Sequence, residues 1–239
     1  MGAAETMSTV NRRPWGLGHV FVGLLLAEAA VLAAIFAFGS GSLEGGFDDL
    51  SIEMIAVLQA ALWLGTLGVP VWLVWGRGVA WSELGWGFRR RDTVSGLLIG
   101  IGTQVVAVPL LYLPLMLLVG DLDIAEPARD LVDKATGAGV ALLVLVVVVG
   151  APVVEEIFYR GLTLRALEGR MRPAFALFVS SLLFAVIHIQ VTQFPALLLF
   201  GLVAGRLAQK DGRIGRAIWA HIGFNGTTIL LLLLPVSTI

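Results

Sequence analysis

The chain has 239 residues, of which 58% are hydrophobic and 14% are charged, and its mean hydropathy is +0.92. Soluble domains are about 45–50% apolar and about 25% charged, so this composition excludes an ordinary soluble domain and indicates a membrane protein. The chain contains no cysteine, which excludes disulfides, thiol catalysis and cysteine-bound metals. A net charge of −1 gives no indication of nucleic-acid binding.

Apolar helices follow one another along the whole chain, and several approach or exceed the roughly 20 residues that cross a bilayer. There is no room for a sizeable soluble domain as well. We therefore expect an all-α, polytopic membrane bundle that forms a single domain over residues 1–239. The seven predicted transmembrane helices cover residues 15–38, 52–75, 93–119, 137–159, 173–189, 194–208 and 217–234.

The first predicted helix follows Arg12 and Arg13, as the apolar part of a signal peptide would. Its apolar stretch is too long for that role, so an uncleaved first span is expected. After the second helix, residues 77–92 combine aromatic side chains with a run of arginines. This composition predicts a segment at the membrane–water interface.

The basic residues are distributed unevenly between the two sides of the predicted bundle. If the N-terminus is cytoplasmic, only Arg129 and Lys134 of the 16 basic residues fall on the outer connections. The positive-inside rule then predicts a cytoplasmic N-terminus and an outer C-terminus. Arginine far outnumbers lysine, which suggests a bacterial inner membrane. The acidic residues of the outer loops are Glu44, Asp48, Asp49, Glu53, Asp121, Asp123, Glu126, Asp130 and Asp133.

Charged side chains inside a span are costly and by default indicate a functional site. The sequence VVEEIFYRG places Glu155, Glu156 and Arg160 directly after a very apolar run, and Glu28 lies within the first helix. Glu156 and Arg160 are four residues apart, so they share a helix face and can form an ion pair. Glu155 points about 100° away from that face and is free to act as a general base or acid.

Two further pairs of residues have the same four-residue spacing. Phe184 precedes His188 on the fifth predicted helix, and His221 precedes Asn225 on the seventh. The second pair projects an imidazole and a carboxamide from one helix face. Taken alone, His188 could also be a core histidine, and His221 with Asn225 a purely structural hydrogen-bonding pair.

Helix geometry predicts that Glu155 and His188 lie at one depth. Both are about 25 Å along their helices from the turn at 168–173, if the fourth helix continues to about residue 168. They can then face each other across an antiparallel hairpin. The depth of His221 is left open, because this residue follows the basic connection 206–216 closely.

The three motifs in this order, Glu-Glu-x-x-x-Arg, Phe-x-x-x-His and His-x-x-x-Asn, resemble those of the CAAX prenyl protease and bacteriocin-processing family of intramembrane endopeptidases, also called the Abi family. The resemblance covers a core at residues 140–230. It implies that Glu155 activates water and that His188 holds this water or a zinc ion. It also implies that His221 and Asn225 stabilise the oxyanion, while Glu156 and Arg160 support the site.

Peptide hydrolysis needs a base for water, a stabiliser of the oxyanion and an acid for the leaving amine, and these residues can supply all three within a polar cavity. Two versions of the hydrolysis mechanism remain open. One is a metal-free glutamate mechanism, and the other is Zn²⁺ bound by Glu155, His188 and His221. The expected substrate is a membrane-associated peptide or protein, cut near the cytoplasmic face.

Two other functions remain open. A proton-coupled transporter would also use intramembrane carboxylates and histidines, but the sequence shows no inverted repeat. A non-catalytic scaffold or immunity protein of the same family could retain the motifs. The sequence does not identify the natural substrate or the oligomeric state.

Overall fold

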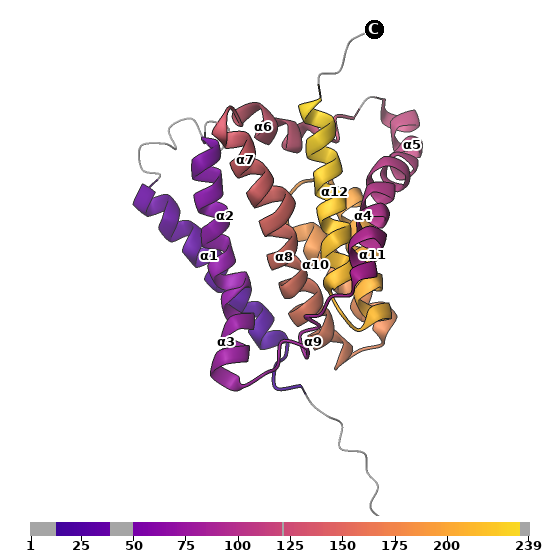
Figure 1. Cartoon of the computed structure of the whole chain (residues 1–239). Helices are drawn as coiled ribbons and strands as arrows, with labels where there is room; N and C mark the ends of the chain where they lie inside the picture. The colour runs from indigo at the N-terminus through magenta and orange to yellow at the C-terminus, as the bar shows by residue number, and fades with distance from the viewer. Residues whose placement is uncertain (1–12, 39–49, 121, 235–239) are drawn as a thin grey trace, which may run out of the picture.

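A computed structural model describes residues 13–38, 50–120 and 122–234, and this part of the chain is all-helical, without strands (Figure 1). The prediction of an all-α fold is confirmed. The first three long helices are α1 (Leu17–Phe38), α2 (Ile52–Thr66) with α3 (Gly68–Arg77), and α4 (Arg90–Gly102), which continues through η2 (Thr103–Ala107) into α5 (Val108–Val119).

The second half of the bundle contains the predicted site residues. One continuous helix runs through α7 (Ala138–Leu143), η3 (Val144–Gly150), α8 (Ala151–Glu155), η4 (Glu156–Leu164) and α9 (Arg165–Glu168), where η marks π-helical turns. Its end at Glu168 agrees with the predicted turn. The remaining long helices are α10 (Pro173–Ile187), α11 (Phe194–Asp211) and α12 (Gly215–Leu233).

Within the described residues, four helices are long and apolar enough to cross a membrane. The predicted helices after them are α10, which has only 15 residues, and α11 and α12, which carry charged or polar side chains. The described residues thus form eight helices. Of the seven predicted membrane crossings, four are supported by the length and composition of their helices. The four spans are Leu17–Phe38, Ile52–Arg77, Arg90–Val119 and Ala138–Glu168.

One described helix was not predicted. α6 (Glu126–Lys134) is strongly amphipathic and packs across α7 and α12 at one end of the bundle (Figure 1). From the sequence this segment was predicted to be an outer loop, because it is rich in charged residues and its apolar face is short. Val132 on that face is buried against Leu143 and Ile229.

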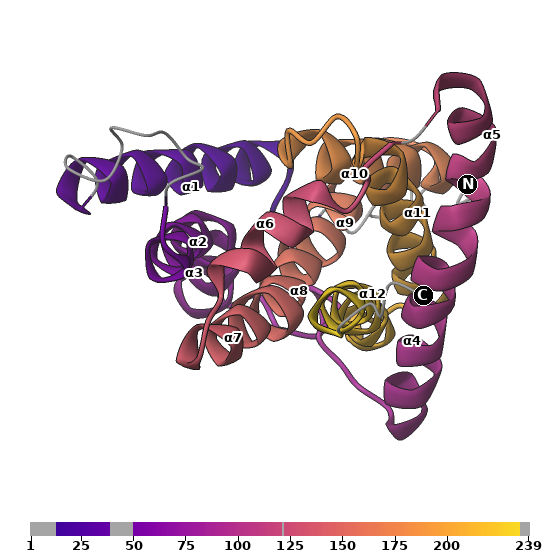
Figure 2. The same ribbon diagram turned by 90° about the horizontal axis from the view of Figure 1, so that it is seen from above.

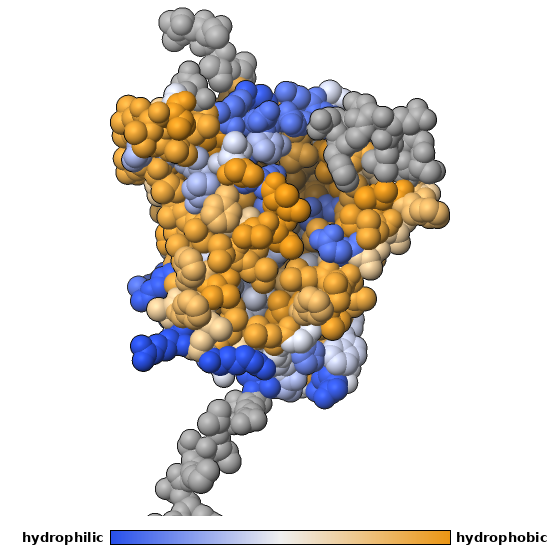
Figure 3. Space-filling view, turned by 180° about the vertical axis from the view of Figure 1, so that it is seen from behind, coloured by the Kyte–Doolittle hydropathy of each residue, from blue (hydrophilic) through white to orange (hydrophobic). Residues whose placement is uncertain are grey.

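On the face drawn in Figure 3, an apolar belt lies between two hydrophilic ends. One end, here called the basic end, consists of residues 78–89, 169–172 and 212–214. Hydrogen bonds tie these connections together: Arg165 Nη2 donates to Gly212 O over 2.7 Å, and Ile214 N donates to Gly85 O over 2.8 Å. Arg213 is paired with Asp92, and this hydrogen bond raises the pKa of Arg213.

Small residues let the site helices approach closely, as expected where lipid cannot drive helices together by the hydrophobic effect. A Cβ atom built on Gly100 of α4 would lie 1.9 Å from Ala220 O of α12. One built on Gly201 of α11 would lie 3.0 Å from Ser181 Cβ of α10. Gly201 begins the sequence GLVAG, whose spacing is typical of such contacts. The packing at Gly100 fixes the part of α12 that carries His221.

Candidate active site

Three helical segments bring the predicted site residues into the interior. Glu155 and Glu156 lie where α8 passes into η4, His188 follows the last residue of α10, and His221 lies two turns into α12. α12 begins at Gly215, slightly earlier than predicted, and this start leaves room for His221 to reach the glutamates.

Glu156 is the centre of a buried polar network. Its side chain is fully buried, and its Oε1 accepts a hydrogen bond from Arg160 Nη1 over 2.8 Å. The same oxygen accepts one from His221 Nδ1 over 2.9 Å. The ion pair with Arg160 agrees with the four-residue spacing, while the bond to His221 was not predicted. Glu156 therefore links η4 to α12.

Only 1% of the Arg160 side chain is exposed, and its positive charge is compensated by several partners. Besides Glu156, its Nη2 donates to Gly201 O of α11 over 3.3 Å. The guanidinium lies 4.5 Å from the ring centre of Phe184, a distance at which a cation is attracted by an aromatic face. A buried charge needs such partners, because its desolvation is costly.

His221 joins the two glutamates. Its Nδ1 donates to Glu156, so in the neutral imidazole Nε2 carries the lone pair. This Nε2 lies 3.8 Å from Oε2 of Glu155, whose side chain is 16% exposed. The separation is too long for a direct hydrogen bond but suits two groups that share one water molecule.

His188 is oriented by the end of its own helix. Its Nδ1 donates to Phe184 O over 2.6 Å, one of the last carbonyls of α10, which have no partner within the helix. The next residue, Ile189, has φ +53°, a rare conformation for a β-branched residue that turns the chain sharply. His188 and His221 both contact the Phe184 ring, with centroid distances of 4.8 and 5.8 Å.

Asn225 has a structural partner that sequence reasoning did not anticipate. Its Nδ2 donates to Val147 O over 2.9 Å. Val147 lies in the π-helical turn η3, where the N–H of Ala151 donates a hydrogen bond to Val146 O, five residues earlier. The next donor in that pattern would be Pro152, which has no N–H. Asn225 therefore satisfies a carbonyl that Pro152 leaves without a partner.

The structure thus places Glu155, Glu156, Arg160 and His221 in one contact network. In the described part of the chain, His188 forms no ion pair with Glu155, and Asn225 bonds to the backbone instead of to His221. Phe200, which sequence reasoning missed, lies 4.6 Å from the His221 ring. An isolated phenylalanine in an apolar helix gives no signal of such a role.

The predicted zinc ligands do not form a ready site. Glu155 and His221 are neighbours, but within the described residues no three histidine or acidic side chains form a group that could hold a metal ion. The bond from His221 Nδ1 to Glu156 leaves Nε2 available, and metal-binding histidines commonly make a bond of this kind with the second ring nitrogen. The zinc version of the site therefore stays a prediction.

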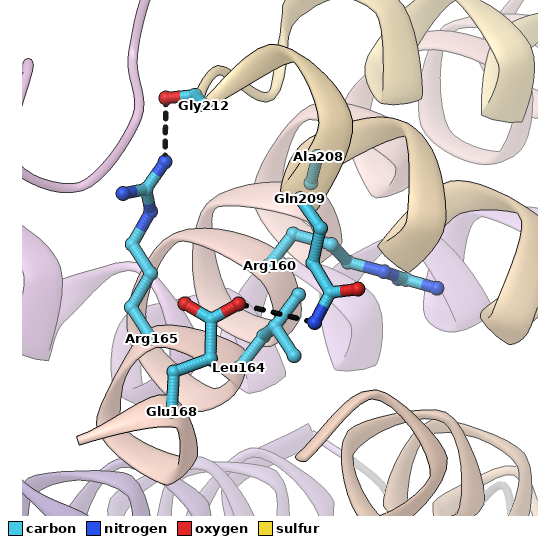
Figure 4. A pocket seen from close by; sticks show the side chains of 7 residues that line it. All are labelled: Arg160, Leu164, Arg165, Glu168, Ala208, Gln209 and Gly212. Carbon is cyan, nitrogen blue, oxygen red and sulfur yellow. Dashed lines mark hydrogen bonds between the residues drawn. The ribbon is translucent and has the colours of Figure 1, made fainter. Parts of the chain in front are cut away.

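A small cavity of about 60 Å³ lies at the basic end, between η4, α9 and α11 (Figure 4). Arg165, Glu168, Gln209 and Gly212 line it, and Gln209 donates to Glu168 over 3.1 Å. The guanidinium of Arg160 points away from this cavity in Figure 4. The cavity has room for about two water molecules and is separate from the Glu155–His221 pair.

The family comparison identifies the region that contains this network. Residues 137–227 match the family described as "Type II CAAX prenyl endopeptidase Rce1-like". The comparisons with curated proteins and with solved structures gave no match. The family match confirms the resemblance seen in the sequence: residues 137–227 are similar to the CAAX prenyl protease family.

Proposed function

We propose that this protein is an intramembrane endopeptidase that hydrolyses a peptide bond of a membrane-associated peptide or protein. The family match supports endopeptidase activity at the level of the family, and the four apolar helices support a multi-pass membrane protein. The observation that supports the mechanism is the 3.8 Å separation of Glu155 Oε2 and His221 Nε2. The other ring nitrogen of His221, Nδ1, is bonded to Glu156, which orients the imidazole.

In the proposed reaction, a water molecule lies between Glu155 and His221. It donates one hydrogen bond to the Glu155 carboxylate and one to His221 Nε2. Glu155 removes a proton as the water oxygen attacks the carbonyl carbon of the substrate. The carbonyl oxygen becomes an oxyanion, the C–N bond then breaks, and Glu155 returns the proton to the leaving nitrogen. Products are a carboxylic acid and an amine.

Asn225 can stabilise the oxyanion. Asn225 donates one amide hydrogen to Val147 O and retains a second. This role of Asn225 agrees with the one that the family resemblance implies, whereas the resemblance assigns His221 to the oxyanion and not to the water.

We also propose that α10, α11 and α12 lie across the cell membrane with the four apolar spans, and that the basic end is cytoplasmic. The arginines of residues 78–89, 169–172 and 212–214 then face the cytoplasm, as the positive-inside rule requires. Arg12 and the acidic residues at 39–49, which supported this orientation in the sequence, lie outside the described residues.

Comparative proteomics tests the proposed function. Membrane fractions of cells that express either the wild type or Glu155→Gln are compared, with Glu126→Gln of α6 as the matched control. We expect at least one membrane peptide to remain uncut with Glu155→Gln only. Identical peptide profiles for all three would contradict a protease and leave a scaffold. Proton-linked solute uptake abolished by Glu155→Gln would indicate a transporter.

A further inference from the structure

Phe200 of α11 lies against the imidazole that the proposed reaction uses, although it belongs to none of the three motifs. Its side chain is fully buried, and its ring centre lies 4.6 Å from that of His221, with 47° between the two ring planes. The same ring stacks on Phe224, with 4.5 Å between the centres and 26° between the planes. His221 and Phe224 are three residues apart on α12, so Phe200 packs against the helix face that carries the imidazole.

Hydrogen bonding fixes only one point of the His221 ring. Its Nδ1 is bonded to Glu156 Oε1, while its Nε2 lies 3.8 Å from Glu155 Oε2, too far for a direct bond. A ring that is held at one atom still rocks about that bond, and this rocking carries Nε2 away from Glu155. The contacts that oppose the motion are the rings of Phe184 and Phe200. Phe200 is the nearer of the two, at 4.6 Å against 5.8 Å between ring centres.

The backbone that carries Phe200 is itself fixed to two other helices of the site. α11 lies beside α10 and α12 in the bundle (Figure 2). The carbonyl of the next residue, Gly201, accepts a hydrogen bond from Arg160 Nη2 over 3.3 Å. A Cβ atom on Gly201 would lie 3.0 Å from Ser181 Cβ, so α11 is already in close contact with α10 at this level. Phe200 therefore projects onto His221 from a rigid position.

From this geometry we infer that Phe200 is a positioning residue, which holds the His221 ring so that Nε2 faces Glu155 across the place of the attacking water. The inference rests on the proposed function, because the water between Glu155 and His221 belongs to that reaction. It adds a residue outside the three motifs and gives α11 a part in the reaction. A misplacement of about 1 Å can lower a catalytic rate about a hundredfold, so a contact of this kind affects kcat.

Cleavage kinetics of the purified full-length protein in nanodiscs test this inference, with a membrane peptide from the proteomic comparison as the substrate. Phe200→Leu keeps an apolar side chain and removes the ring. Phe200→Met fills the space with a longer, flexible chain and replaces the leucine variant if that one unfolds. Phe158→Leu is the matched control, because Phe158 is equally buried but packs edge-on against Tyr159 and makes no ring contact with a described histidine. Glu155→Gln is the control for catalysis.

We expect kcat of the Phe200 variants to fall by about ten- to a hundredfold while KM changes by less than about twofold, because Phe200 orients the imidazole and does not hold the substrate. Phe158→Leu should retain both constants. An unchanged kcat in the Phe200 variants, an equal fall in Phe158→Leu, or a loss that appears in KM alone would overturn the positioning role. If Glu155→Gln cuts as fast as the wild type, the proposed function itself fails.

Nuclear magnetic resonance of protein labelled with ¹⁵N-histidine gives a readout that does not depend on cleavage. The chain has three histidines, and the signal that disappears in His221→Gln belongs to His221. We expect a single Nδ1–H tautomer of His221 in the wild type and in Phe158→Leu, because Nδ1 donates to Glu156. The Phe200 variants should show exchange between both tautomers, because a rocking ring leaves Glu156 part of the time. A single, unchanged tautomer in these variants would contradict the inference whatever happens to cleavage.

Discussion

Most polar side chains of the candidate site are held by a hydrogen-bond partner. Glu156 binds Arg160 and His221, and His188 binds the end of its own helix. Only Glu155 combines partial exposure with a neighbouring imidazole nitrogen, which suits the residue that meets water. The surrounding bonds fix the orientation of the imidazoles, so that little reorganisation is needed during the reaction.

Breaking the Glu156–Arg160 pair should destabilise the protein more than removing the whole pair. Glu156→Leu leaves the buried guanidinium of Arg160 without a counter-charge, so we expect a loss of about 3–5 kcal/mol in the free energy of unfolding. The double variant Glu156→Leu/Arg160→Leu should recover most of it but stay inactive, because His221 has lost its acceptor. Unfolding in detergent followed by tryptophan fluorescence, together with peptide cleavage, would check both results. Full activity in the double variant would contradict this role of Glu156.

At the scale of elements, the site depends on irregular helices. Glu155 lies between the two π-helical turns η3 and η4, and wide turns of this kind occur often at functional sites. Sequence periodicity could predict that residues 137–159 form a helix, but not the wide turns within it. For the same reason it could not predict that Asn225 bonds to Val147 O.

The bond between Asn225 and Val147 predicts a specific rescue. Asn225→Ala should cost about 1–3 kcal/mol, because it leaves a partly buried carbonyl unsatisfied. Pro152→Ala provides the missing N–H, so the double variant should regain much of this stability. A double-mutant cycle measured by thermal unfolding would show a coupling between the two positions. Strictly additive effects would contradict this explanation of Asn225.

Close packing between α4 and α12 should be essential for the position of His221. Gly100→Ala brings a methyl group against the backbone of Ala220, and overpacking of this kind costs about 1–3 kcal/mol or more. Gly102→Ala is the matched control, because nothing lies within 4 Å of its added methyl group and alanine favours the helix. Thermal unfolding should separate the two variants. Equal stability would show that the α4–α12 contact can relax.

At the scale of the whole molecule, the sequence predicted the helical class, the region of the site and the Glu156–Arg160 pair. These features follow from hydropathy and from spacing within one helix. The links between helices, such as Glu156 to His221, depend on which helix faces pack together, and one sequence does not contain this information. The amphipathic helix α6 was missed because its charges resemble those of a loop.

The absence of cysteine permits a direct test of orientation. A single cysteine is placed either at the exposed Ser82 of the basic end or at the exposed Asp130 of α6. If the basic end is cytoplasmic, a membrane-impermeant maleimide should label Asp130→Cys in intact cells and Ser82→Cys only after permeabilisation. The reverse pattern would contradict the proposed orientation.

The most direct test of the central claim is the rate of peptide cleavage by purified protein in nanodiscs, measured after treatment with a zinc chelator. If Glu155 and His221 activate water without a metal, the chelated wild type should retain its rate, and Glu155→Gln should lose at least about a hundredfold. A chelated wild type that is inactive and recovers with added zinc, or a fully active Glu155→Gln, would contradict the mechanism.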